Sequence, residues 1–119
     1  MHGLRTALLA ATGAAALALT GCATADPVEL TADTVVIDVR TADEYAAGHL
    51  KGAVNLDLTS GELADQLPQL DDDSDYVVYC QSGNRSSQAA QLLEDTGLVV
   101  TDAGSMQQAA SATGLPVVP

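Results

Sequence analysis

Aromatic and basic side chains are scarce in this sequence. It has no tryptophan, no phenylalanine and three tyrosines, and its 4 lysines and arginines stand against 16 aspartates and glutamates in 119 residues. Without large aromatic rings, the core must be built from valine, leucine, isoleucine and alanine, which bury less apolar area per side chain. A formal charge of −12 repels phosphate groups, which argues against any nucleic-acid partner. The hydrophobic content of 47% fits one small globular domain.

The N-terminus has the layout of an export signal. A short basic end precedes an apolar stretch over residues 7–19, which is shorter than the roughly 20 residues that a membrane-spanning helix needs. It runs into Leu19-Thr20-Gly21-Cys22, which resembles a bacterial lipobox, the motif in which the cysteine is lipidated and becomes the new N-terminus. We therefore expect residues 1–21 to be a lipoprotein signal peptide. Cys22 would then anchor the exported protein to the cell membrane, facing outside the cytoplasm.

Two other interpretations of this segment stay open, namely an ordinary secretory signal cut nearby and a disulfide at Cys22. Residues 22–30 are mostly small and polar, with one proline, and are expected to form a tether. The domain itself is then expected over residues 31–119. If Cys22 carries lipid, Cys80 is the only thiol left in a compartment where thiols usually pair, which invites a functional explanation.

Strands alternate with helices along the rest of the chain. β-Branched runs predict buried strands, and apolar side chains three and four residues apart predict helices. A Thr41–Glu44 capping box marks the start of one helix. Strands are expected over residues 34–39, 52–56, 76–79 and 98–101, and helices over residues 41–47, 61–67, 86–95 and 105–113. This order predicts a parallel sheet covered on both faces, with functional sites at the carboxyl ends of its strands.

An acidic run lies between the second expected helix and the next strand. Asp71-Asp72-Asp73-Ser74-Asp75 places carboxylates side by side, as a calcium loop would. The ordered spacing and the closing glutamate of such a loop are absent. We therefore expect a solvated turn and no metal site.

The surroundings of Cys80 favour chemistry over its plainest interpretation, a small buried hydrophobic residue. Cys80 follows a buried strand and opens a short loop that leads into a helix, where backbone N–H groups converge and favour negative charge. Gly83 permits a tight turn of amides, and Arg85 adds a positive charge. This arrangement predicts a thiol of lowered pKa and a grip for an anionic substrate. The serines Ser82, Ser86 and Ser87 are expected either to add hydroxyl donors or to cap the helix.

Two stretches resemble the signatures of the rhodanese-like sulfurtransferase family. The stretch Cys80-Gln81-Ser82-Gly83-Asn84-Arg85-Ser86 resembles the active-site loop of that family. Upstream, its other signature is resembled by Ile37-Asp38-Val39-Arg40, Glu44-Tyr45, Gly48-His49-Leu50, Gly52-Ala53 and Asn55. The two stretches come in the order that the family has. The likeness covers residues 30–118, which is nearly the whole expected domain.

The resemblance implies a three-layer α/β fold with a five-stranded parallel sheet and helices on both faces. It also implies sulfur transfer in two steps, in which the Cys80 thiolate takes the outer sulfur of a small anionic donor such as thiosulfate and passes it on. The acceptor would be a thiol, cyanide or a protein. Because the cysteine carries the sulfur, no cofactor is implied. Donor binding would fall to the loop residues Gln81, Ser82, Gly83, Asn84, Arg85 and Ser86.

The length of the loop separates this chemistry from that of related phosphatases and arsenate reductases. Those domains have five residues between the cysteine and the arginine, which leaves room for a tetrahedral oxyanion at the thiolate. Here four residues lie between Cys80 and Arg85. We therefore expect sulfur transfer and not phosphate hydrolysis.

Other polar residues of the upstream signature are expected to support the site. In the family the equivalents of Asp38 and Arg40 brace neighbouring loops by ion pairing, and the same is expected here. His49 lies in a tight turn with no second histidine nearby, so we expect a hydrogen-bonded structural role. Tyr45 is expected in the core.

The stretch from Ala103 to Ala109 departs from the family pattern. It matches the usual glycine-glycine-tryptophan motif only at Gly104 and loosely at Met106, so the aromatic packing of that region is missing. The departure concerns stability more than the chemistry of the Cys80 loop.

Two further functions stay open at this point. One is a non-catalytic module that binds a protein partner or carries persulfide between enzymes, and the other is a thiol redox sensor that forms a sulfenic acid. The strong negative charge also opposes a doubly charged donor. Loop amides and Arg85 must overcome that repulsion if thiosulfate is the substrate.

Overall fold

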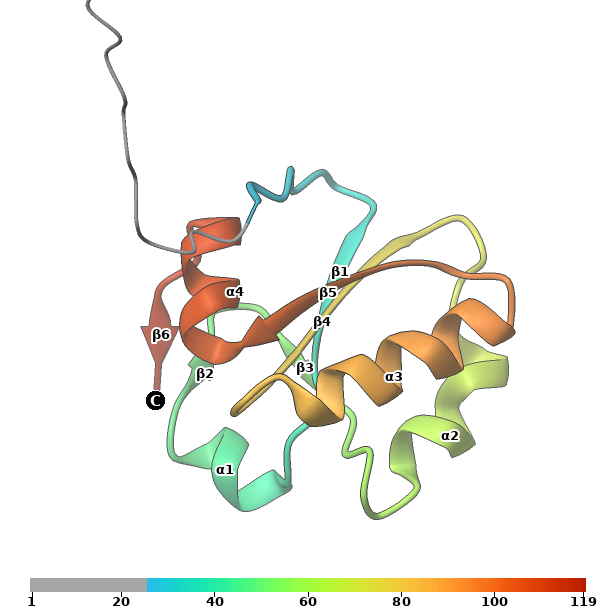
Figure 1. The fold of residues 1–119 in the computed structure, drawn as a ribbon, viewed down its shortest axis with the longest axis horizontal. Helices are drawn as coiled ribbons and strands as arrows, with labels where there is room; N and C mark the ends of the chain where they lie inside the picture. The colour runs from blue at the N-terminus through green and yellow to red at the C-terminus, as the bar shows by residue number, and fades with distance from the viewer. Residues whose placement is uncertain (1–25) are drawn as a thin grey trace, which may run out of the picture.

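A parallel sheet of four strands lies at the centre of residues 26–119, the part of the chain that this computed structural model describes (Figure 1). The α/β fold expected from the sequence is confirmed. The parallel sheet has four strands where five were expected, and a separate antiparallel pair accompanies it. The spatial order of the sheet is β3 (Val54–Asn55), β1 (Thr34–Asp38), β4 (Asp75–Cys80) and β5 (Val99–Ser105), and the pair consists of β2 (His49–Leu50) and β6 (Val117–Val118).

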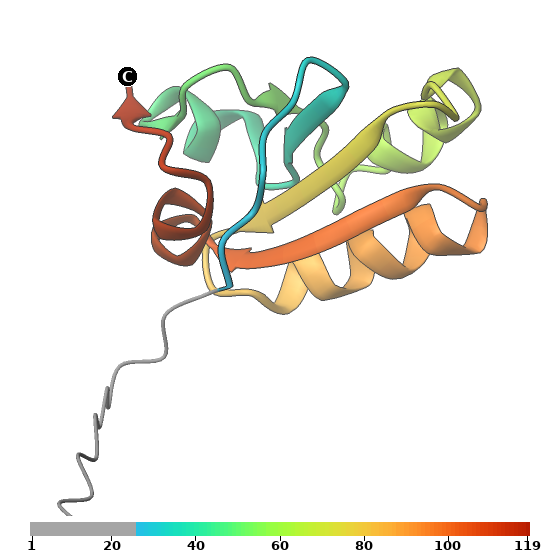
Figure 2. The same ribbon diagram turned by 90° about the horizontal axis from the view of Figure 1, so that it is seen from above.

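Helices cover both faces of the sheet (Figures 1 and 2). Side chains of α2 and α3 pack on one face, and side chains around α1 and α4 pack on the other. The three layers of the fold follow from this arrangement. The helices are α1 (Ala42–Ala46), α2 (Glu62–Gln66), α3 (Asn84–Asp95) and α4 (Met106–Thr113), and a 3-10 turn, η1 (Leu67–Gln69), continues α2.

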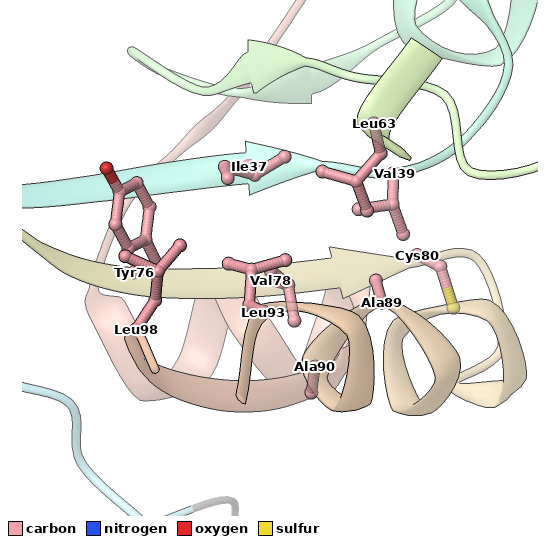
Figure 3. Close-up of a cluster of buried hydrophobic side chains, with 10 residues drawn as sticks. All are labelled: Ile37, Val39, Leu63, Tyr76, Val78, Cys80, Ala89, Ala90, Leu93 and Leu98. Carbon is pink, nitrogen blue, oxygen red and sulfur yellow. The ribbon is translucent and has the colours of Figure 1, made fainter. Parts of the chain in front are cut away.

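Alternation along the strands divides the core into two clusters. Ile37 and Val78 face α2 and α3, and their neighbours Val36 and Val77 face the other side. Figure 3 shows the first cluster, in which aliphatic side chains of β1 and β4 meet Leu93 of α3. Small alanines on α3 and α4 allow these helices to approach the sheet closely. The aliphatic core expected from the composition is present: within the two clusters only Tyr76 and Tyr79 are buried rings, and the half-buried ring of Tyr45 packs against the second cluster.

Two capping boxes begin helices of the domain. In α1 the Thr41 hydroxyl accepts from the Glu44 amide and the Glu44 carboxylate accepts from the Thr41 amide, as the sequence predicts. Ser105 and Gln108 repeat the arrangement at the start of α4, and Gly114 ends that helix in the left-handed region. Both boxes satisfy backbone groups that would otherwise lack partners.

Three segments differ from the expectation. The helix α3 begins at Asn84 instead of Ser86, because Gly83 turns the chain with φ at 101° and the next residue is already helical. Val117 and Val118 form β6, a two-residue strand too short to predict. The segment expected as a tether contributes to the domain from its apolar positions: the Val28 amide donates to the Ala112 carbonyl at 2.8 Å, and Leu30 packs against the second cluster.

The expected signal peptide over residues 1–21 and the lipidation site Cys22 lie outside the described residues. Within residues 26–119, no helix has the length and apolar character to cross a bilayer. The predictions for the N-terminus therefore stay predictions.

The hydroxyl of Tyr79 stabilises the core by accepting a hydrogen bond from the Leu50 amide at 3.0 Å, where both residues are fully buried. We expect Tyr79→Phe to lower the free energy of unfolding by about 1–3 kcal/mol, because it leaves that amide without a partner. Denaturant unfolding measures the loss. Tyr76→Phe is the matched control, since its hydroxyl donates to the carbonyl of exposed Asp71, where water can take over. Equal losses in the two variants would contradict the assignment.

Candidate active site

Cys80 ends the buried strand β4, at the edge of the sheet where the parallel strands have their carboxyl ends. Figure 3 shows its sulfur directed toward the start of α3. The pairing of β4 with β5 shifts register between Val78 and Cys80, so a bulge lies directly beside the cysteine. The side chain is fully buried, and among the described residues Cys80 is a free thiol.

Backbone amides of the loop surround the sulfur. The Gly83 amide donates to Cys80 Sγ at 2.9 Å. Burial raises the pKa of the thiol, but hydrogen bonds from Ser86, Gly83 and Ser82 outweigh burial, so the net pKa of Cys80 is lowered. The Ser86 hydroxyl donates to the Gly83 carbonyl at 3.0 Å. Its single proton therefore cannot also be fully donated to the Cys80 sulfur. We therefore attribute the stabilisation of the thiolate mainly to the backbone amides.

The left-handed turn at Gly83 brings the loop against a second glycine. A Cβ atom at Gly83 would lie 3.8 Å from the Cα of Gly104, which itself has φ at 77°. A Cβ atom at Gly104 would collide with Oε1 of Gln108, the oxygen that accepts from the Ser105 amide. Glycine at 104 thus lets the start of α4 pack against the Cys80 loop.

The other loop residues divide into an exposed and a buried set. Gln81, Ser82 and Asn84 are exposed around the thiol, and Ser86 is buried beneath it. The serines were expected as donors or helix caps, and Gly83 takes the cap position without any side-chain hydrogen bond. Ser86 instead ties the first turn of α3 back to the loop.

Asp38 and Arg40 form a buried ion pair below the loop. Arg40 Nη2 lies 2.7 Å from Asp38 Oδ2, and Asp38 also accepts from Nε and from the Arg40 amide. The remaining arginine donors reach the Gly48 carbonyl at 2.6 Å and Gln81 Oε1 at 3.0 Å. Burial lowers the pKa of Arg40, but the contacts with Asp38 outweigh it and raise the pKa overall. The pair therefore connects β1, the turn after α1 and the Cys80 loop.

Arg85 makes a two-pronged ion pair with Glu44 beside the loop. Nη1 donates to Oε1 at 2.7 Å and Nη2 to Oε2 at 3.0 Å. The contact with Arg85 is the largest cause that lowers the pKa of Glu44 to about 2, and the contact with Glu44 in turn raises the pKa of Arg85. The expected free positive charge at Arg85 is thus shared with a carboxylate.

His49 and Tyr45 lie on the face of the sheet opposite the thiol. The Nδ1 atom of His49 is 2.9 Å from the Tyr45 carbonyl oxygen, and the two rings stack with centroids 3.7 Å apart. The Tyr45 hydroxyl donates to the Ala53 carbonyl, and its half-buried ring packs against the second cluster. Through these contacts, both side chains help to hold α1 against the segment that follows it.

A hollow of about 290 Å³ lies along β5 and α4. Its lining has no cysteine, histidine or basic side chain, so we do not place the chemistry there. The lining residues are Asp26, Thr101, Asp102, Ala103, Gly104, Gln108 and Ala112.

Sequence reasoning missed the contribution of Glu44 to the site. It identified Glu44 as a helix cap, which is confirmed, but not as the partner of Arg85. A signal was present: after pairing Arg40 with Asp38, Arg85 is the one remaining basic residue of the expected site in a strongly acidic chain.

Comparison with known proteins agrees with this geometry. The sequence model of the rhodanese-like domain family matches residues 25–112. A solved structure described as a rhodanese with anions, from E. coli, superposes with a TM-score of 0.61 at 30% identity, over 71% of this chain and 96% of that one.

Two curated relatives differ in what they do. The chain is 36% identical over 89 residues to an HTH-type transcriptional regulator of Mycobacterium tuberculosis, over 71% of this chain and 38% of that protein. It is 43% identical over 63 residues to the thiosulfate sulfurtransferase GlpE of Pseudomonas entomophila, over 53% of this chain and 56% of the relative. The chain thus spans 38% of the regulator and 56% of the sulfurtransferase, less than two thirds of each.

Removing one partner of the buried ion pair should destabilise the protein more than replacing both partners. We expect Asp38→Ala to lower the free energy of unfolding by about 3–5 kcal/mol, because Arg40 is left charged and unpaired in the interior. The double variant Asp38→Ala with Arg40→Met should lose less than Asp38→Ala alone. Denaturant unfolding of the wild type, both single variants and the double variant tests this. Losses that add up across the cycle would show that the two side chains do not depend on each other.

The loop amides predict a pH profile for Cys80. Because its folded-state pKa is lowered, the thiolate should form at lower pH in the folded protein than in the unfolded chain. We expect the rate of alkylation by iodoacetamide to rise with a midpoint below 9.0, the ordinary value. Cys22→Ser makes Cys80 the only thiol, and the same protein in denaturant is the control. Identical midpoints in the two states would rule out stabilisation of the thiolate by the fold.

Proposed function

Because the chain belongs to the rhodanese-like domain family, we propose that it is a sulfurtransferase in which Cys80 is both nucleophile and sulfur carrier. One observation carries the proposal: the Cys80 sulfur lies at 2.9 Å from the Gly83 amide at the start of α3, in a loop that lowers its pKa. A thiolate held by fixed amides forms at lower pH than that of an ordinary cysteine, which makes it more available as a nucleophile. The sulfurtransferase relative described above supports the same chemistry.

In the first step, the Cys80 thiolate attacks the outer sulfur of thiosulfate or a similar donor. A sulfur–sulfur bond forms at Cys80, the sulfur–sulfur bond of the donor breaks, and its electron pair leaves with sulfite. Charge and atoms balance without an oxidant or a proton. The amides of Ser82, Gly83 and Ser86 then face the negative charge of the new persulfide, as they faced that of the thiolate.

In the second step, a thiophilic acceptor attacks the outer sulfur of the Cys80 persulfide. A thiol or cyanide would take this sulfur and return the Cys80 thiolate, which closes the cycle. Gln81, Ser82 and Asn84 are exposed at this side of the loop, so they would contact donor and acceptor in turn. A protein carrying a reactive thiol would also fit this role.

The proposed location is the outer side of the cell membrane. Support comes from the basic and apolar N-terminus that ends in Leu19-Thr20-Gly21-Cys22, where lipid would be attached at Cys22. Because Val28 already contacts α4, the domain would lie close to this anchor.

A second candidate is a module that binds or carries persulfide without efficient turnover. The match to the transcriptional regulator favours this candidate. It covers 71% of this chain, and the name of that protein describes no enzyme. In this case Cys80 would load with sulfur but release it only to a specific partner protein.

Intact mass tests the proposal directly. We expect purified full-length protein carrying Cys22→Ser to gain the mass of one sulfur atom on incubation with thiosulfate. The same protein with Cys80→Ser added should gain nothing, because it has no thiol to hold the sulfur. Release on addition of cyanide or a small thiol, measured as thiocyanate or persulfide, would distinguish turnover from a carrier that holds its sulfur.

Absence of the sulfur adduct in a folded protein with a free Cys80 thiol would refute transfer from thiosulfate. Oxidation of Cys80 to a sulfenic acid under dilute peroxide would then favour the sensor hypothesis.

A further inference from the structure

Glu44 occupies the side of Arg85 that an anionic donor would use. Although 41 residues separate them, both guanidinium Nη atoms donate to the two carboxylate oxygens, at 2.7 and 3.0 Å. This two-pronged geometry is the one in which arginine grips planar or tetrahedral anions. A sulfur donor at Cys80 therefore meets an arginine whose strongest binding mode is already taken.

The carboxylate is also held from its other side. The amide and the hydroxyl of Thr41 each donate to Glu44 Oε1 at 3.1 Å, which closes the capping box of α1. Separating Arg85 from Glu44 would thus leave the carboxylate in place, next to the incoming donor. The negative charge of Glu44 cannot withdraw from the site without breaking the start of the helix.

Little positive charge remains elsewhere to compensate. Residues 26–119 hold three basic side chains, and the donors of Arg40 are taken by Asp38, the Gly48 carbonyl and Gln81. Lys51 is exposed in the turn after β2. Asp57 adds a second carboxylate close enough to Arg85 to raise its pKa. Around Arg85, the carboxylates of Glu44 and Asp57 therefore outnumber the single positive charge.

The geometry points to Glu44 as a specificity-determining residue that, by neutralising Arg85, makes the site favour singly charged sulfur donors over doubly charged ones. The class favoured is a monoanion with a transferable sulfur, such as a persulfide or an organic thiosulfonate. This inference rests on the proposed sulfur transfer by Cys80. Glu44 is a positioning residue, because it acts on the donor through Arg85 and does not touch the reacting sulfur.

The variant Glu44→Gln tests this inference. Glutamine keeps an oxygen that accepts from Thr41 and so keeps the capping box, but it removes the negative charge. Thiosulfate and methanethiosulfonate offer Cys80 the same kind of sulfur–sulfur bond and differ by one charge. Single-turnover persulfide formation, followed by mass over a range of donor concentrations in the Cys22→Ser protein, separates donor binding from the bond-forming step.

We expect the half-saturating concentration of thiosulfate to fall about fivefold in Glu44→Gln, with the limiting rate within about twofold of the parent protein. Because the Coulomb energy scales with donor charge, the value for methanethiosulfonate should fall only about twofold. A purely structural role for Glu44 would weaken both donors alike and would lower the limiting rate.

Two controls locate the effect. Asp43→Asn removes the same charge from an exposed position on α1, and in the described part of the chain the side-chain partner of Arg85 is Glu44 and not Asp43, so this variant should leave the ratio of the two donors unchanged. In an Arg85→Met background, Glu44→Gln should change that ratio less than about twofold, because the residue through which it acts is gone.

The outcomes separate this inference from the proposed function. Persulfide that forms with both donors at an unchanged ratio in Glu44→Gln would overturn the inference and leave sulfur transfer intact. A rise in the half-saturating concentration of thiosulfate would also overturn it, since Glu44 would then orient Arg85 for binding. If the parent protein forms no persulfide with either donor, the proposed function fails and the inference fails with it.

Discussion

The buried ion pair of Asp38 and Arg40 holds together the segments that surround the thiol. Its arginine reaches the end of β1, the Gly48 carbonyl and Gln81 of the Cys80 loop, so three separate stretches of the chain meet at one guanidinium. Burying two charges is costly unless every donor and acceptor finds a partner. Here the described residues contain no buried side-chain polar atom without one. The pair therefore restricts how the loop can lie, which a hydrophobic replacement of equal volume would not do.

The thiolate is stabilised by dipoles more than by net charge. The Gly83 amide lies at hydrogen-bond distance from the Cys80 sulfur, and the amides of Ser82 and Ser86 also lower its pKa; as backbone groups they need no rearrangement when charge develops on sulfur. The one arginine of the loop is meanwhile shared with Glu44. This division explains how a chain of net charge −12 can hold an anionic nucleophile: remote carboxylates are screened by salt over about 8 Å, whereas the amides are in direct contact.

Local patterns in the sequence were sufficient to predict most of the architecture and the position of Cys80 at the end of a buried strand. The β-branched run of β1 and the Thr41–Glu44 box depend on neighbours in sequence, and both were predicted correctly. The start of α3 was placed late, because the sequence alone does not show that Gly83 adopts φ at 101°. The pairing of β2 with β6 and the contact of Glu44 with Arg85 were missed, since each joins residues far apart in the chain. Such contacts depend on how the layers pack and not on any local pattern.

The capping box of α1 makes one carboxylate serve two purposes. This helix has five residues, none of them buried, so its hydrogen-bonded start contributes much of what holds it in shape. The same oxygen that closes the box also receives Arg85. Evolution therefore cannot adjust the electrostatics of the loop at this position independently of folding: a neutral residue that cannot accept a hydrogen bond would release the arginine and loosen the helix together. Glutamine is the side chain that separates the two effects, because it removes the charge and keeps a hydrogen-bond acceptor for the capping box. Few substitutions at this position can therefore change the charge and preserve the fold.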